Sequence, residues 1–258
     1  MAGAKLGIRV VHLEAGLRSR DRAMPEELNR LVTDVLSDVL WTPSPDADDN
    51  LRAEGIPEAR ISRVGNIMLD SFELVRPRIE AADTPAMFGL SGQPYAVVTL
   101  HRPGNVDRAE TLAPLVDALV AVQAEFPIVF PVHPRTAARL AEFGLRDRLE
   151  QAGARLVDPM PYVRFMSLVA NAAAAITDSG GIQEETTYLG IPCLTLRENT
   201  ERPITLTQGT NRLVHADTLL SGLRRARATE WSPVRPAYGD GKTAARCVED
   251  LRRRSRAG

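Results

Sequence analysis

The sequence has few of the residues from which disulfide frameworks and metal centres are built. Its 258 residues include 2 cysteines and 4 histidines. Cys193 lies in an apolar stretch, so a reducing, cytoplasmic setting fits better than a disulfide framework. Because histidines and cysteines form no cluster, we predict no metal site. Because there is no full dinucleotide fingerprint, we expect no redox cofactor.

A surplus of one charge sign is absent as well. Lysine and arginine number 32 and aspartate and glutamate 33, for a formal net charge of -1. This balance provides no basic field for nucleic acid or for an anionic membrane surface. No apolar run approaches the length of a membrane span, and the first residues have no signal-peptide core. We therefore expect a soluble, cytoplasmic protein with neither nucleic acid nor a membrane as partner.

The composition is that of an ordinary globular protein, with 44% hydrophobic and 25% charged residues. Strand-like and helix-like segments alternate along the chain, which predicts an α/β fold with parallel, doubly wound sheets. A loose segment, Ala82–Gln93, is rich in glycine, proline and aspartate and reads as a linker. It would separate a first domain over residues 1–82 from a second over residues 93–241.

In the first domain, strands are expected at Ile8–Leu13, Val39–Thr42 and Arg60–Val64, and helices after Pro25, after Ser44 and near Leu69–Ile79. Apolar residues recur at helical spacing after Pro25, at Leu28, Leu31, Val32, Val35 and Val39. This spacing predicts an amphipathic helix that leaves Arg30 on another face.

In the second domain, strands are expected at Tyr95–Leu100, Ile128–Val132, Arg155–Val157, Ala173–Thr177 and Cys193–Arg197. Helical segments separate them, including Tyr162–Asn171 and a segment over Arg139–Gly153 that Gly144 interrupts. A final helix is expected within residues 242–258.

The most informative stretch is the turn between the fourth of these strands and a helix predicted from Ile182. Its sequence is Asp178-Ser179-Gly180-Gly181. Two glycines let a ligand approach the backbone closely, and the N–H groups of a helix start favour an anion. Ser179 could cap the helix, and Glu185, one turn further on, could accept the hydroxyls of a ribose. The alternative is an ordinary helix start with solvated glutamates.

Two further residues stand where strands end. Glu14 follows the first strand and is either a cap or an ion-pair partner of Arg18, or a general acid/base or hydroxyl-binding carboxylate. His101 follows the first strand of the second domain and is either structural or catalytic. Strand ends of this kind form the ligand edge of open α/β sheets.

Six segments, in order from about Val11 to Arg202, carry a family resemblance: HLEAGLRS, MPEELNR, TLHRPGN, PVHPRT, TDSGGIQEE and RENTERP. Together they resemble the UDP-N-acetylglucosamine 2-epimerases of the non-hydrolysing type. The resemblance implies a GT-B fold of two Rossmann-like domains and a homodimer. It also implies interconversion of UDP-GlcNAc and UDP-ManNAc, by elimination and re-addition of UDP, for cell-surface polysaccharide precursors.

The resemblance also implies roles for single residues. Glu14, Glu26 and His101 would be the catalytic acid/base groups, while Glu27 has no such role and reads as structural. The substrate-binding residues would be Arg30 and Arg202 on the substrate, Ser179, Gly180 and Gly181 on the diphosphate, Glu185 on the ribose, Phe165 against the uracil or ribose, and His133 in the nucleotide site. The chain departs from the family at Pro103-Gly104, where an arginine-glutamate pair is common.

The resemblance covers the C-terminal two-thirds of an epimerase. A first strand, a basic loop and an essential aspartate would lie upstream of Met1, so we expect the N-terminal domain to be incomplete, with the final helix packing back on it. We expect little activity from this chain alone. A start-site error, a truncation and a split enzyme remain open.

Other functions fit the same residues. A hydrolysing 2-epimerase, an epimerase of a modified UDP-sugar or a glycosyltransferase would share the scaffold. A non-catalytic UDP-binding fragment or partner subunit is the alternative outside enzymes. Product analysis distinguishes them, since free ManNAc with UDP indicates hydrolysis.

Overall fold

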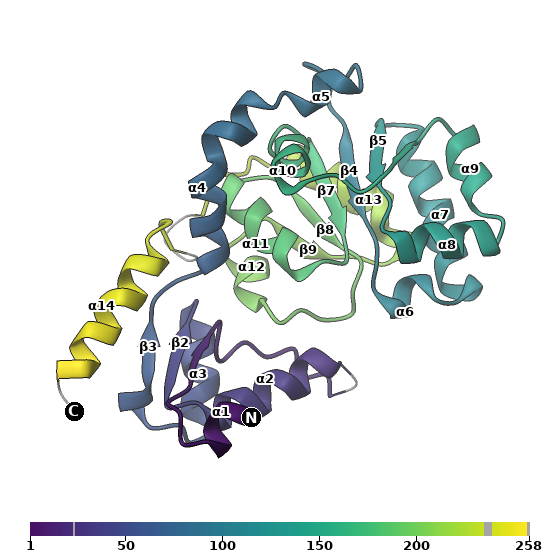
Figure 1. The fold of residues 1–258 in the computed structure, drawn as a ribbon. Coiled ribbons are helices and arrows are strands. Elements are labelled where there is room, and N and C mark those ends of the chain that lie inside the picture. Colours follow the sequence, from purple (N-terminus) through teal and green to yellow (C-terminus); the bar gives the residue numbers. More distant parts are fainter. Residues whose placement is uncertain (23, 235–238, 257–258) are drawn as a thin grey trace. The chain divides into compact units, whose positions relative to one another are not determined.

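The computed structural model describes residues 1–22, 24–234 and 239–256. The chain forms two compact units (Figure 1). Unit 1 comprises Met1–Leu74, Thr200–Gln208 and Val234–Gly258, and unit 2 comprises Val75–Asn199 and Gly209–Pro233. The division falls within helix α4 (Ile67–Ala81), and the predicted linker contains the short helix α5 (Thr84–Met87).

Unit 1 contains a parallel sheet of three strands in the order β1-β2-β3. These are β1 (Val11–Leu13), β2 (Val39–Thr42) and β3 (Ile61–Arg63), and all three predicted strands are confirmed, although β1 begins three residues later than expected. The helices are α1 (Ala2–Lys5), α2 (Pro25–Leu36), α3 (Pro45–Ala53), the start of α4, α12 (Pro203–Thr207) and α14 (Thr243–Arg256). Strand β2 is buried throughout, as the middle strand of a parallel sheet must be.

Helix α14 is held to the sheet of unit 1 by both apolar and polar contacts. Cys247 packs in one cluster with Val39, Trp41 and Val64. The Trp41 indole N–H donates a 2.8 Å hydrogen bond to Oδ2 of Asp250. The last two residues of the predicted range 242–258 lie outside the described residues.

Helix α2 buries polar residues and exposes apolar ones. Its buried side chains are Glu27 and Asp34, whereas Leu28, Val32, Val35 and Leu36 are exposed. The predicted helix is therefore confirmed, but in unit 1 its carboxylates face inward, because each of the two accepts hydrogen bonds from the loop after β1.

Unit 2 contains a parallel sheet of six strands in the order β6-β5-β4-β7-β8-β9. The strands are β4 (Ala96–Thr99), β5 (Ile128–Pro131), β6 (Arg155–Val157), β7 (Ala174–Thr177), β8 (Cys193–Thr195) and β9 (Asn211–Leu213). The five predicted strands are confirmed, and β9 was not predicted. The chain leaves β4 toward β5 and β6 on one side and reaches β7, β8 and β9 on the other, which is the strand order of a Rossmann-like fold.

The helices of unit 2 besides α5 are α6 (Pro103–Val106), α7 (Ala109–Gln123), α8 (Pro134–Glu142), α9 (Arg146–Gln151), α10 (Tyr162–Ala170), α11 (Gly180–Leu189) and α13 (Leu219–Ala228) (Figure 1). Helices α7, α9 and α13 share one hydrophobic core with the strands, including Val98, Phe130 and Ile176. Helices α10 and α11 pack against each other, and α11 lies on β7 and β8. Parallel strands covered in this way place all their carboxyl ends at one edge.

Two further observations on the described residues concern the state of the cysteines and helices that could span a membrane. Cys193 and Cys247 are both buried, free thiols. In the part that the structure describes, no helix has the length and apolar character needed to cross a membrane.

Candidate functional site

The site in unit 2 is built where β4 and β7 end side by side. Thr99 and Thr177 are paired in register, and their hydroxyl oxygens lie 2.6 Å apart. From these strands the chain runs in opposite directions across the sheet, and such a reversal of strand order is where open α/β sheets bind their ligands. His101 follows β4 and Asp178 follows β7, which brings both side chains to this point of the sheet edge.

Asp178 is fully buried and organises the loop that carries His101. Its carboxylate lies 2.9 Å from Nδ1 of His101 and accepts hydrogen bonds from the backbone N–H groups of His101 and Arg102, at 3.0 and 2.9 Å. The side-chain amide of Asn105 donates a further bond at 3.1 Å. Burial alone would raise the pKa of Asp178, but the hydrogen bonds from His101 and the backbone outweigh it, and the pKa is lowered.

This contact gives the imidazole of His101 a defined orientation. A carboxylate at Nδ1 favours a proton on that nitrogen, which leaves Nε2 free to accept one. The ring is 40% exposed, so a ligand can reach it. His101 can therefore act as a general base, with Asp178 holding its tautomer.

Next to His101 lies a pocket of about 180 Å³. The rings of His101 and His133 approach with centroids 5.7 Å apart, and Phe165 of α10 lines the same pocket. Pro131, Pro159 and Met160 complete an apolar wall. The structure thus brings together three of the predicted site residues, from two strand ends and one helix, around a space suited to a planar ring.

The predicted anion site is the start of α11. Ser179 occupies the N-cap position, but its side chain makes no capping bond, and the helix begins at Gly180 rather than at Ile182. The Ser179 N–H donates to Thr177 Oγ1 at 2.9 Å, which fixes the turn. Gly180 and Gly181 follow Asp178 by two and three residues, so the helix start and the His101 loop belong to one site.

Glu185 is 3% exposed and faces Tyr162 of α10. The Tyr162 hydroxyl donates a 2.7 Å hydrogen bond to Oε1 of Glu185. Burial raises the pKa of Glu185 to about 7, with a smaller contribution from neighbouring Glu184, while the Tyr162 bond lowers it. A carboxyl group with this pKa changes charge near neutral pH, which is common at functional sites.

In unit 1, Glu14 lies just past β1 with a φ of 66°, in the left-handed region that residues other than glycine rarely adopt. The alternative of an ion pair with Arg18 is wrong: Arg18 pairs with Asp34 at 2.7 Å and with Glu54 at 2.6 Å. Glu14 is not a helix cap either, because the following residues form a loop. Within the described chain its carboxylate has no hydrogen-bond partner, which leaves it available to a ligand.

Asp34 holds the loop that presents Glu14. Its carboxylate lies 2.5 Å from Nδ1 of His12 and accepts a bond from the Gly16 N–H at 3.1 Å, in addition to the Arg18 pair. Since Asp34 is fully buried, these contacts fix the backbone on both sides of Glu14.

The three predicted residues around helix α2 have different environments. Glu26 is exposed in the first turn. Glu27 is 1% exposed and accepts bonds from the N–H groups of Ser19 and Arg20, at 2.8 and 3.0 Å, which supports its reading as structural. Arg30 lies 3.5 Å from Glu27.

Arg202 is nearly buried at the N-cap of α12, and its guanidinium bonds Glu201 at 2.9 Å. It is grouped with unit 1.

Three residues of these sites were not predicted: Asp178, Tyr162 and Asp34. Asp178 stood within the glycine turn, but its partner His101 is 77 residues away and the order of strands could not be read from the sequence. For Tyr162, the available signal was its spacing of three residues from Phe165, which puts both on one side of α10.

Comparisons with known proteins identify the family of the chain. The sequence model of the family described as UDP-N-acetylglucosamine 2-epimerase matches residues 1–252. A UDP-N-acetylglucosamine 2-epimerase of Methanococcus maripaludis is 42% identical over 224 residues, covering 84% of this chain and 61% of the relative. A UDP-2,3-diacetamido-2,3-dideoxy-D-glucuronate 2-epimerase of Pseudomonas aeruginosa is 36% identical, covering 97% of this chain and 70% of the relative.

A solved structure is also similar. The crystal structure of the Methanocaldococcus jannaschii UDP-GlcNAc 2-epimerase, in complex with UDP-GlcNAc and UDP, matches with a TM-score of 0.86 at 39% identity. The match covers 96% of this chain and 70% of that one. The expected α/β, GT-B-type fold of Rossmann-like domains is thereby confirmed, and the chain spans about two thirds of the length of these relatives. On the family match and on these identities, the chain belongs to the UDP-N-acetylglucosamine 2-epimerase family.

Proposed function

We propose that this protein interconverts UDP-N-acetylglucosamine and UDP-N-acetylmannosamine. The observation that carries the proposal is the His101–Asp178 pair at the carboxyl ends of β4 and β7, beside the glycine start of α11. An acid/base group next to an anion site is what elimination of a diphosphate from a sugar requires.

Unit 2 is the proposed UDP-binding part. The uracil would lie in the pocket of His133 and Phe165, and the ribose hydroxyls would donate to Glu185. The diphosphate would accept hydrogen bonds from the Ser179 hydroxyl and from the N–H groups of Gly180 and Gly181, where the helix dipole also favours negative charge. Arg202 and Arg30 would add positive charge on the substrate.

The reaction would proceed in two steps, an elimination and an addition. In the first, a base takes the proton from C2 of the sugar as the C1–O bond to UDP breaks, which leaves 2-acetamidoglucal. In the second, the proton returns to the opposite face of C2 and UDP adds again at C1. The proposed proton-transfer groups are His101 in unit 2 and Glu14 and Glu26 in unit 1. The Glu14 carboxylate has no hydrogen-bond partner within the described chain, which supports its role as one of these groups.

The test follows UDP-GlcNAc in D₂O by NMR. The proposal expects UDP-ManNAc with deuterium at C2. The assay uses this chain and a chimera that adds the part of the Methanocaldococcus relative outside the match, because the match covers 70% of that relative. Free ManNAc with UDP would point to the hydrolysing alternative. UDP binding without any turnover in the chimera would point to a non-catalytic UDP-binding subunit.

A modified UDP-sugar is the second candidate substrate. It is favoured by the 36% identity to the Pseudomonas enzyme, whose name gives a diacetamido-glucuronate substrate. Parallel assays with UDP-GlcNAc and that sugar nucleotide distinguish the two, since the preferred substrate has the higher kcat/KM.

The oligomeric state, the location and the partners of the protein are proposed from other observations. A homodimer is supported by the exposed apolar residues of α2, which are numerous for a free surface. The two free, buried thiols support a cytoplasmic location, and the balanced charge supports neither nucleic acid nor a membrane as partner. The product would serve as a precursor of cell-surface polysaccharide.

A further inference from the structure

Tyr162 is the first residue of α10, and its side chain links that helix to α11. Its hydroxyl donates a 2.7 Å hydrogen bond to Oε1 of Glu185. In the part of the chain that the structure describes, no other group donates a hydrogen bond to this carboxylate. The Tyr162 hydroxyl is therefore the protein donor that sets the direction of the two carboxylate oxygens.

The two partners of this bond differ in exposure. Glu185 is 3% exposed, whereas Tyr162 is 40% exposed and can be reached by a ligand. Phe165, three residues further along α10, lines the pocket beside His101. Residues three apart on a helix are neighbours on its surface, so Tyr162 lies on the side of α10 that borders this pocket.

The donor is fixed in place and keeps its proton. Burial and the nearby Glu185 carboxylate raise the pKa of the Tyr162 hydroxyl, so the phenol stays protonated at neutral and mildly alkaline pH. Helix α10 is tied to the sheet at its other end, because the Tyr95 hydroxyl donates a 2.5 Å hydrogen bond to the Leu168 carbonyl. These contacts are present without a nucleotide.

We propose that Tyr162 is a positioning residue that makes the nucleotide site select a ribose. Its hydroxyl turns the Glu185 carboxylate so that Oε2 accepts hydrogen bonds from the ribose hydroxyls. The last torsion of a glutamate side chain is broad, so without this bond the carboxylate would also adopt orientations that the ribose cannot use. This inference rests on the proposed function, in which Glu185 holds the ribose.

The test compares UDP with 2′,3′-dideoxyuridine 5′-diphosphate, which lacks both ribose hydroxyls, by calorimetry on the full chain. The wild type should bind UDP about tenfold more tightly than the analogue. Tyr162→Phe should lower this preference to about threefold or less, by weakening UDP alone. The titrations are made near pH 9, above the Glu185 pKa of about 7, so that orientation is measured and not charge.

A double substitution shows whether Tyr162 acts through Glu185. Glu185→Gln should itself reduce the preference for UDP, because an amide oxygen is a weaker acceptor than a carboxylate. Adding Tyr162→Phe to Glu185→Gln should cause no further loss. A further loss would overturn the positioning role, since it would mean that Tyr162 contributes to ribose binding independently of Glu185.

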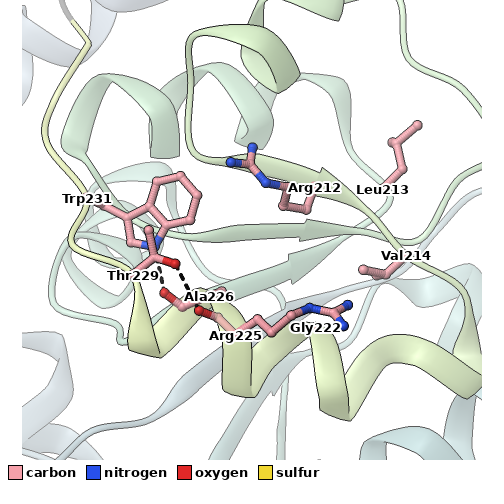
Figure 2. A pocket seen from close by; sticks show the side chains of 8 residues that line it. All are labelled: Arg212, Leu213, Val214, Gly222, Arg225, Ala226, Thr229 and Trp231. Carbon is pink, nitrogen blue, oxygen red and sulfur yellow. Dashed lines mark hydrogen bonds between the residues drawn. The ribbon is translucent and has the colours of Figure 1, made fainter.

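Two control variants remove other hydroxyl donors from unit 2. Tyr95→Phe removes the donor to Leu168 on the same helix. Thr229→Val removes a hydroxyl that donates to the Arg225 carbonyl at 3.0 Å, in a separate hollow between β9 and α13 (Figure 2). That hollow shares no lining residue with the pocket beside His101. Both variants should keep the preference of the wild type.

The outcomes separate this inference from the proposed function. An unchanged preference in Tyr162→Phe, or an equal loss in Tyr95→Phe, would overturn the role of Tyr162 while UDP binding, and with it the proposed function, remained in place. Equal affinity of the wild type for UDP and the analogue would also overturn it. No binding of UDP by the wild type would contradict both.

Discussion

The Nδ1 atom of His101 lies 2.9 Å from Oδ1 of Asp178, and the two residues follow adjacent parallel strands from which the chain continues in opposite directions across the sheet. The Asp178 carboxylate also accepts hydrogen bonds from the backbone N–H groups of His101 and Arg102. One buried carboxylate thus sets the position and the tautomer of the imidazole together, which makes it the residue through which the chemistry of His101 is most directly tested.

Asp178→Asn should lower kcat in the active chimera by about 10²-fold or more, the lower end of what general acid–base groups contribute. The amide keeps the shape of the side chain but no longer favours a proton on Nδ1 of His101. UDP affinity should change little, because Asp178 is fully buried and not a proposed ligand contact. Steady-state kinetics and UDP calorimetry measure both. Equal losses in kcat and UDP affinity would show that the variant disturbs the whole site.

UDP affinity should rise as the pH increases through about 7, the pKa of Glu185. The carboxyl group is protonated below this pH and accepts the ribose hydroxyls as a carboxylate above it. Calorimetry across the pH range measures the profile. In Glu185→Gln, which cannot ionise, only the titration of the diphosphate itself should remain. A profile identical to that of the wild type would assign the pH dependence to another group.

Tyr162→Phe should move the midpoint of that profile to higher pH. The Tyr162 hydroxyl donates to Glu185 and lowers its pKa, so losing the donor raises the pKa further above its ordinary value. The same calorimetric series measures the shift. A midpoint that stays in place or moves down would mean that the hydrogen bond does not act on the ionisation of Glu185.

Asp250→Asn should lower the free energy of unfolding of unit 1 by about 1–3 kcal/mol, the range for hydrogen bonds lost at a buried charged group. Burial alone would raise the pKa of Asp250, but bonds from Trp41, Arg254 and Arg253 lower it from 3.8 to about 2. A lowered pKa means that the stabilisation is present above the unfolded value and is lost as the pH falls toward about 2.

Urea unfolding at several pH values measures this difference between Asp250→Asn and the wild type. The difference in the free energy of unfolding between the two proteins should vanish as the solution becomes acidic. Asp147→Asn, at an exposed position of α9, is the matched control and should change little. A gap that stays constant down to low pH would show that the charge of Asp250 is not what stabilises the fold.

Much of the fold could be predicted from the sequence, because apolar strands between amphipathic helices have a local pattern. Strand β9 could not, since it has only three residues, with Asn211 buried and Arg212 exposed, and so lacks an apolar run. The sequence also could not show which face of α2 is buried in unit 1. An apolar stripe does not show that Asp34 and Glu27, on the other side, are needed to satisfy buried N–H groups.

The parts of the sites that are set by local backbone structure could be predicted from the sequence. Side-chain contacts between residues distant in the sequence could not. The glycine turn after β7 and the strand-end positions of His101 and His133 follow from local sequence. The bond between Tyr162 and Glu185 spans 23 residues and depends on how α10 and α11 pack, which no local pattern encodes. The alternative of an ion pair between Glu14 and Arg18 could not be excluded from the sequence for the same reason, because it is the folded chain that brings Asp34 and Glu54 to that arginine.

Calorimetric titration of UDP into the wild-type chain and Gly181→Val tests most directly whether the edge of the second sheet is a nucleotide site. A side chain at this position would block the approach of a diphosphate to the backbone at the start of α11. Ala141→Val, at an exposed helical position of α8, controls for the introduction of a valine, and thermal melting confirms that both variants fold. The account predicts that the wild type and the control bind UDP and that Gly181→Val does not. Equal UDP affinity in all three, or no binding by the wild type, would contradict it.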